Sequence, residues 1–158
     1  MSVWCAQGTG RVMRPRILTG VQILMMGLAS AMHAATVTWQ GDVSTNWADG
    51  ANWDMGYAPG SADQVVIDGA APYHPTLSLA GGSTNINSLS IGVNSTSILT
   101  VANGNVTDRK LVIAGDCVVS TNGVVTHGNN STGETHRLFL DIGGNLLVTT
   151  GGPINVDG

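Results

Sequence analysis

The feature that most constrains this chain is a nine-residue segment that occurs twice with the same ending. Residues 99–107 align without a gap on residues 118–126, and both segments end in Asn-Gly-x-Val-Thr. A looser third copy covers residues 147–154. A short apolar segment precedes each copy, at residues 89–92, 111–115 and 138–143. Self-similarity of this kind is typical of stacked repeats, so the sequence predicts an all-β fold, a parallel β-helix or β-solenoid.

The spacing of the copies predicts a coil of about twenty residues. Gly104 and Gly123 are 19 residues apart, and Leu89 and Leu111 are 22 apart. The next steps are longer because they contain a polar segment, residues 127–136, that has no apolar periodicity. A repeat array tolerates such an insertion as a loop on one face, and we expect one there.

Alternation of apolar and polar residues within the copies identifies the side chains that should point into the core. The expected inward residues are Ile91, Val101, Ile113, Val125, Leu140, Ile142 and Val148. The Asn-Gly pairs at 103–104 and 122–123 are expected at left-handed corners, where glycine has no steric penalty. In this alignment Asn103 lies over Asn122, which predicts a short ladder of stacked amides.

Residues 1–35 have the pattern of a secretory signal peptide. Three arginines precede an apolar run at residues 17–32, and the small residues Ala34 and Ala35 follow it. A membrane helix needs about 20 apolar residues, so we expect a cleaved signal and no membrane insertion afterwards. The expected cleavage follows Ala34 or Ala35, with Ala31 as the alternative position. A start at Met13 would give a more ordinary signal peptide, so Met13 is an alternative initiator.

Charge and cysteine content narrow the functions open to the remaining chain. Without residues 1–35 the chain has three positive and ten acidic residues, a net charge of −7. Nucleic-acid binding requires clustered Lys and Arg side chains, so we exclude nucleic acid as a partner. Cys117 is then the single cysteine and cannot form an internal disulfide. Its apolar neighbours predict a buried side chain.

A tryptophan-rich segment, residues 36–80, precedes the coils. Trp39, Trp47 and Trp53 are followed by a Pro-Gly turn and by a second apolar run at residues 63–68. In one interpretation the rings plug the N-terminal end of the solenoid, each burying on the order of 200 Å². In the other, exposed rings stack on sugars, which makes these three tryptophans candidate carbohydrate contacts. We favour the plug, because the end of an array exposes apolar surface and unpaired strand edges.

The order of these motifs resembles the start of bacterial exported β-solenoid proteins. This group includes the autotransporter-associated β-strand repeat proteins and large surface proteins with a C-terminal sorting signal. The resemblance rests on Trp-x-Gly, two Asn-Trp pairs, Pro-Gly and Asp-x-Val-Val-Ile, and it extends to residues 86–92. It implies a Trp-rich N-terminal cap at residues 36–80, directly after the signal peptide. It also implies that residues 81–158 are β-solenoid coils that continue in a longer protein.

The sequence contains no pattern that points to catalysis, to a metal or to a cofactor. Polysaccharide-cleaving β-helices need clustered carboxylates, or a carboxylate with Arg or Lys, on one face. Asp116 and Asp141 lie at unequal offsets from their repeat leucines and should not stack. His127 and His136 flank the polar segment, and two histidines without a third ligand are a weak metal signal. Residues 42–49 are rich in Asp and Asn but fail the EF-hand pattern. We favour turn bonds for these side chains, with a looser calcium site of Asp and Asn oxygens as the alternative.

We therefore expect a non-enzymatic, structural or adhesin-type segment of a secreted or cell-surface protein. Its expected partners are surface glycans or other cell-surface proteins, and no cofactor is expected. One alternative is the N-terminal, non-catalytic part of a secreted polysaccharide-acting enzyme. The other is a carbohydrate-binding module that uses the three tryptophans.

Overall fold

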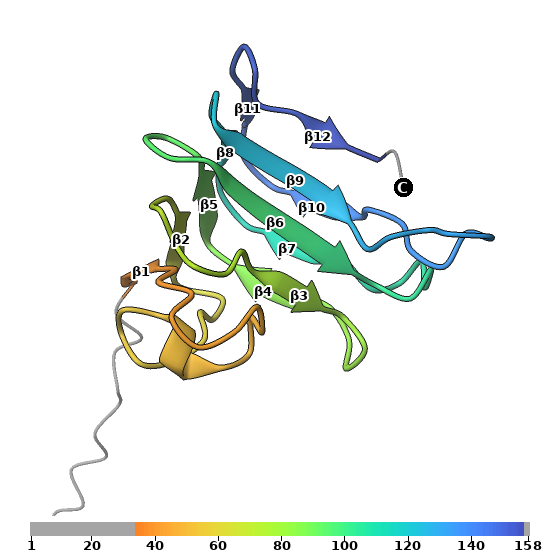
Figure 1. Cartoon of the computed structure of the whole chain (residues 1–158), viewed down its shortest axis with the longest axis horizontal. Coiled ribbons are helices and arrows are strands. Elements are labelled where there is room, and N and C mark those ends of the chain that lie inside the picture. Colours follow the sequence, from red (N-terminus) through yellow and green to blue (C-terminus); the bar gives the residue numbers. More distant parts are fainter. Residues whose placement is uncertain (1–33, 157–158) are drawn as a thin grey trace, which may run out of the picture. The chain divides into compact units, whose positions relative to one another are not determined.

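The structure is a computed structural model that describes residues 34–156. The described part consists of short strands and one 3-10 turn, η1 (Gly50–Asn52), as Figure 1 shows. It contains no helix that is both long and apolar enough to cross a membrane. The expected signal peptide lies outside the described residues except for its last two positions, and the alternative start at Met13 lies wholly outside them.

The strands form three parallel sheets. The first sheet contains β1 (Thr36–Thr38), β2 (Gln64–Ile67), β5 (Ser88–Ile91), β8 (Cys117–Val119) and β11 (Leu146–Val148). The second contains β3 (Thr76–Ser78), β6 (Ser97–Ala102), β9 (Gly123–His127) and β12 (Ile154–Asn155). The third contains β4 (Thr84–Ile86), β7 (Leu111–Ile113) and β10 (Leu140–Ile142). Every pair of strands is parallel, which confirms the predicted parallel β-solenoid.

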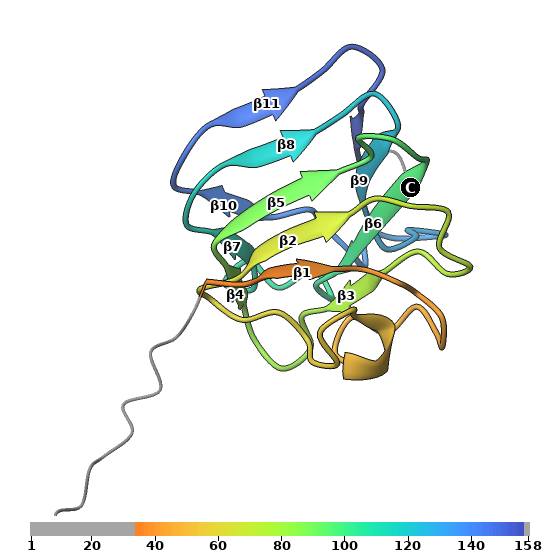
Figure 2. The same ribbon diagram turned by 90° about the vertical axis from the view of Figure 1, so that its left-hand side faces the viewer.

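Each coil passes once through each sheet. The strands β2 to β4, β5 to β7 and β8 to β10 make three complete coils, and β11 and β12 begin a fourth. Figure 2 shows the strands of the first sheet stacked in order from β1 to β11. Hydrogen bonds between strands therefore run along the axis of the stack, from one coil to the next.

The predicted coil of about twenty residues is wrong, because paired residues in successive coils lie 24 to 29 residues apart. Leu111 pairs with Thr84 on one side and with Leu140 on the other, at separations of 27 and 29 residues. The step from β2 to β5 is shorter, since Gln64 pairs with Ser88, 24 residues away. Leu89 and Leu111, which we expected to be equivalent, lie in different sheets.

The predicted register between the two nine-residue copies is also wrong. Leu99 pairs with Val125 rather than with Val118, a shift of seven residues. Gly123 pairs with Ser97, at the start of β6, whereas Gly104 follows the end of that strand. The two Asn-Gly pairs thus occupy different corners of the coil.

This shift removes the predicted amide ladder between Asn103 and Asn122. The Asn103 Oδ1 instead accepts the backbone N–H groups of Asn105 and Arg137, at 3.0 and 2.9 Å. Gly104 has the expected left-handed backbone, with φ +66°, but Gly123 does not. At position 123 glycine is required for space, because a Cβ there would press against the backbone of Ile91.

Loops at the corner between the second and third sheets lengthen from coil to coil. Residues 79–83 join β3 to β4, residues 103–110 join β6 to β7, and residues 128–139 join β9 to β10. Figure 1 shows all three on the same side of the solenoid. The polar segment 127–136 is therefore not an insertion in one coil, as we expected, but the longest loop of a recurring series.

The core lies between the three sheets, and most of the expected inward residues are in it. Four of them are 0% exposed: Ile91, Val101, Ile113 and Val125. Cys117 is buried as well, as predicted. Leu140 and Ile142 are only partly buried, and Val148 is 43% exposed although it stacks in register on the buried Val119. These three belong to the last strands of the stack, which have no described coil beyond them.

A tryptophan cluster closes the core beside β1. Trp39, Trp47 and Trp53 are each 3% exposed, and the ring of Trp53 meets the other two edge to face at centroid distances of 4.9 and 4.8 Å. The three rings belong to the same core as the coil residues, which supports the plug interpretation. The parallel sheets begin before the expected boundary at residue 81, because β2 and β3 lie within residues 36–80.

Candidate functional site

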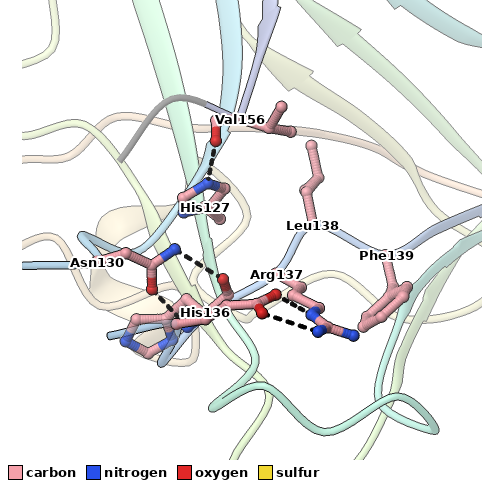
Figure 3. A pocket seen from close by; sticks show the side chains of 8 residues that line it. His127, Asn130, His136, Arg137, Leu138, Phe139 and Val156 are labelled. Carbon is pink, nitrogen blue, oxygen red and sulfur yellow. Dashed lines mark hydrogen bonds and ion pairs between the residues drawn. The ribbon is translucent and has the colours of Figure 1, made fainter. Parts of the chain in front are cut away.

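The cavity that combines charged, aromatic and aliphatic side chains lies at the loop corner after β9. It has a volume of about 390 Å³ and is drawn in Figure 3. Its lining residues come from the end of β9, from the loop 128–139 and from the residue after β12: His127, Asn130, Glu134, His136, Arg137, Leu138, Phe139 and Val156. Two successive coils therefore build it together.

Asn130 holds the loop in its folded-back shape. Its Oδ1 accepts the backbone N–H groups of Thr135 and His136, at 2.8 and 2.7 Å. Its Nδ2 donates to the carbonyl oxygen of His136 at 2.9 Å. An asparagine amide that bonds the backbone on both sides substitutes for the strand pairing that the loop lacks. The loop thus has a fixed shape despite its polar sequence.

A two-point ion pair forms one wall of the cavity. The Nε and Nη2 atoms of Arg137 both bond the carboxylate of Glu134, the second at 2.8 Å. The hydrogen bond from Arg137 lowers the pKa of the Glu134 carboxyl, and the same bond raises the pKa of the Arg137 guanidinium. Both side chains remain exposed, so the pair contributes little to stability but holds two planar polar groups in a fixed orientation.

His127 and His136 line the same cavity, and their ring nitrogens bond backbone groups. His127 is 7% exposed, and its Nδ1 and Nε2 lie 2.6 and 2.8 Å from the carbonyl oxygens of Gly128 and Val156. The Nδ1 of His136 accepts the N–H of Gly104 at 3.2 Å. Within residues 34–156 no group of three metal-ligating side chains comes together. The two histidines instead anchor the corner to neighbouring coils.

Apolar side chains supply the other wall. Leu138, Phe139 and Val156 line the cavity, and Figure 3 shows Arg137 extending toward Phe139. Phe139 is the only phenylalanine in the sequence, and it is partly exposed at this corner rather than buried in the core. An aromatic ring that keeps access to solvent beside fixed polar groups is typical of ligand-binding clefts.

Two buried polar atoms without partners lie beside the same loop. The Nδ2 of Asn103 and the Oδ1 of Asn105 are buried, and neither has a hydrogen bond within the described part of the chain. Asn105 also has a left-handed backbone, with φ +56°. An unpaired buried amide group costs about 1–3 kcal/mol. This corner therefore retains unfavourable features that the regular sheets do not have.

The predicted carbohydrate contacts, Trp39, Trp47 and Trp53, lie in the cap and not at this cavity. Their rings are 3% exposed, so no ring face is open for a sugar to stack on. Two of their indole N–H groups are also engaged: that of Trp39 donates to the Tyr73 carbonyl oxygen at 2.7 Å and that of Trp53 to the Trp47 carbonyl oxygen at 2.8 Å. The geometry favours a structural role for all three.

The acidic and amide side chains considered for catalysis or calcium bind backbone and neighbouring side chains. Asp116 accepts from the backbone and side chain of Asn145, whereas Asp141 forms an ion pair with Lys110 at 2.8 Å. As predicted, the two carboxylates do not stack, since Asp141 pairs with Val112 in the third sheet. Within residues 42–49, the side chains of Asn46 and Asp49 accept N–H groups two residues ahead, as turn residues do.

Comparisons of the chain with protein-family models, with curated proteins and with solved structures find no match. The described residues resemble β-solenoids in architecture, through their parallel pairing and repeated coils. Sequence reasoning located the polar loop and its two histidines but missed Phe139, Arg137 and Val156. Only Phe139 carried a usable signal, as the single phenylalanine beside a polar segment.

Proposed function

We propose that this chain is a non-enzymatic segment of an exported, cell-surface β-solenoid protein of the structural or adhesin type. The observation that carries the proposal is the series of lengthening loops at one corner of a regular stack. Residues 103–110 and 128–139 follow equivalent strands of successive coils and project on the same side. An array of this kind presents binding loops at fixed distances from one another.

The packing of the coils supports a mechanical role. Each interior strand is hydrogen-bonded to a parallel strand on both sides, and the side chains between the sheets are almost fully buried. In such an array each coil is stabilised mainly by its neighbours, so the structure extends as a stiff rod. A stiff rod suits a protein that must hold a binding surface away from a cell.

The ion pairs made by two of the carboxylates support a non-enzymatic role. General acid–base cleavage of polysaccharides needs two carboxyl groups on opposite sides of one bond. Here Asp141 is paired with Lys110 and Glu134 with Arg137, in separate sheets and loops. We therefore propose that any polysaccharide chemistry belongs to other parts of the protein.

Export is the part of the proposal that a single experiment tests most directly. The full chain with a C-terminal epitope tag is produced in a Gram-negative host, and cytoplasmic, periplasmic and medium fractions are compared. We expect the tagged chain outside the cytoplasm, with an N-terminus after Ala34 or Ala35. A matched variant, Leu24→Arg, interrupts the apolar run and should remain in the cytoplasm with its N-terminus intact. Retention of the unaltered chain in the cytoplasm contradicts the proposal.

A second candidate is the non-catalytic, carbohydrate-binding part of a polysaccharide-acting enzyme. The mixed lining of the cavity, with Phe139 beside the Glu134–Arg137 pair, is the observation that favours it. Pull-down on insoluble polysaccharides distinguishes the two. An enzyme-associated segment should bind cellulose, chitin or pectin particles, whereas an adhesin-type segment should bind intact cells in preference to these polymers.

A further inference from the structure

We propose that the cavity at the loop 128–139 binds a neutral sugar unit of a glycan. This inference rests on the proposed function and names its class of partner. It also moves the expected glycan contact from the buried tryptophans of the cap to Phe139 at the corner. The argument has three parts: the size and walls of the cavity, the fixed polar pair, and the local charge.

The size and shape of the cavity suit a small ligand. Its volume of about 390 Å³ lies within the range of small-molecule sites, which is roughly 300–1,000 Å³. The loop that forms it is held by the bonds of Asn130 to its own backbone, and His127 anchors the neighbouring coil. A cavity that is already shaped loses less conformational entropy when a ligand binds.

The apolar wall matches the C–H face of a sugar ring. A pyranose presents several C–H groups on one face and hydroxyl groups around its rim. Phe139 offers an aromatic face, whose negative quadrupole attracts the positive edge of C–H bonds, and Leu138 and Val156 extend the apolar surface. A flat aliphatic ligand would pack on this wall but would make no hydrogen bonds to the polar groups beside it.

The polar wall matches the hydroxyl rim. The Glu134 carboxylate accepts hydrogen bonds and the Arg137 guanidinium donates them, and their two-point contact holds both planes together. Adjacent hydroxyls of a sugar are both donors and acceptors, so one can donate to the carboxylate while the next accepts from the guanidinium. The ion pair keeps this arrangement oriented before the ligand arrives.

Local charge selects a neutral sugar over an acidic one. Glu134 compensates the charge of Arg137 directly, and the cavity contains no lysine. Of the two histidines in the lining, His127 has both ring nitrogens at backbone carbonyl oxygens, and His136 accepts the N–H of Gly104. The chain as a whole has a net charge of −4, which repels anions. A uronic or sialic acid would have to displace Glu134 from Arg137 in order to pair with it, because Arg137 is the one arginine or lysine in the lining.

Binding is measured by saturation-transfer NMR on the full chain. The probes are methyl glycosides of glucose, galactose and mannose, with glucuronate as the acidic comparison, each at about 10 mM because single sugar units bind weakly. We expect signal from at least one neutral glycoside, with its C–H protons nearest Phe139 most strongly saturated. Glucuronate should give no signal above background.

Three variants connect binding to the cavity. Phe139→Leu keeps an apolar wall but removes the ring, and Glu134→Gln keeps the shape of the side chain but removes the charge that holds Arg137. Each should weaken binding about tenfold, a change of about 1.4 kcal/mol. Tyr57→Ala removes an aromatic ring that is 42% exposed in the N-terminal segment and should leave binding unchanged. Circular dichroism confirms that each variant is folded.

Several results would overturn the inference. These are no signal from any neutral glycoside, a signal from glucuronate alone, or binding that Phe139→Leu and Glu134→Gln both leave unchanged. Failure here is separable from failure of the proposed function, because the export experiment does not depend on the cavity. A chain that is exported but binds no sugar would retain the structural proposal and lose this one.

Discussion

Replacement of Trp53 tests whether the tryptophan cluster closes the same core that the coils share. Trp53 lies at the centre of the cluster, with an edge-to-face contact to Trp39 on one side and to Trp47 on the other. Its indole N–H also donates to the Trp47 carbonyl oxygen at 2.8 Å. No other ring in the cluster combines two aromatic contacts with a buried hydrogen bond inside the cluster.

The expected loss of stability follows from these contacts. Truncation of a buried Trp to Ala costs about 3–5 kcal/mol from lost burial and the cavity left behind. The unpaired Trp47 carbonyl would add about 1–3 kcal/mol if water cannot reach it. Trp53→Phe keeps a ring against Trp39 and loses the N–H, so it should cost about 1–2 kcal/mol, close to the hydrogen-bond contribution alone.

Urea unfolding followed by far-ultraviolet circular dichroism measures both variants against the unaltered chain. With a slope of about 1–3 kcal/mol per molar urea, a loss of about 4 kcal/mol lowers the midpoint by roughly 2 M. Met55→Ala is the matched control, because Met55 lies two residues away and is 52% exposed. It should change the free energy of unfolding by less than about 0.5 kcal/mol.

Two outcomes would refute the reasoning. A loss below about 1 kcal/mol for Trp53→Ala would mean that the cluster is not closely packed in solution. A separate early transition of the cap, with unchanged unfolding of the coils, would mean that the rings do not belong to the shared core. The same denaturation curves report both the loss of stability and the number of transitions.

Three further predictions follow from individual residues. Gly92→Ala should lower the free energy of unfolding by about 3 kcal/mol or more, because φ at Gly92 is +70° and a Cβ there would collide with the backbone of the next coil. Gly104→Ala is the control: φ is +66°, but the space around it is open, so it should cost about 1 kcal/mol. Thermal unfolding compares the two variants. Burial raises the pKa of the Cys117 thiol to about 11, so Ellman's reagent should react with it only after unfolding. The stability that the protonated thiol contributes below pH 9.0 should be lost as the pH rises from 9.0 to about 11. Because Arg137 lowers the pKa of Glu134 from 4.5, the carboxyl carbon of Glu134 should titrate at lower pH in the unaltered chain than in Arg137→Ala, and the contact should be lost as pH falls below 4.5.

The sequence predicted the stack of coils and most of the buried positions, because alternation within each strand is local. Ile91, Val101, Ile113 and Val125 could be assigned from that alternation alone, and all four are 0% exposed. The register could not be predicted in the same way. One coil contains several strand–turn units of similar composition, so a match such as residues 99–107 on 118–126 joins different corners of the solenoid.

What fixes the register is contact between coils that are far apart in sequence. Gly92 lies so close to the backbone nitrogen of Gly123 that only a residue without a side chain fits there. The cavity has the same origin, since Val156 reaches the loop 128–139 only because β12 stacks on β9. No pattern within a single coil reveals either contact, which is why the polar loop was recognisable in the sequence but its apolar wall was not.

Burial in this fold depends on the next coil as much as on the direction of a side chain. Val119 and Val148 hold equivalent positions in neighbouring strands, yet the first is 0% exposed and the second 43%. The difference arises because β11 covers β8, whereas no described strand covers β11. A coil gains most of its stability from its neighbours, so a binding cavity built from two coils is formed only when both are stacked. The proposed sugar site should therefore be lost by any change that separates β12 from β9, even one that substitutes none of the lining residues.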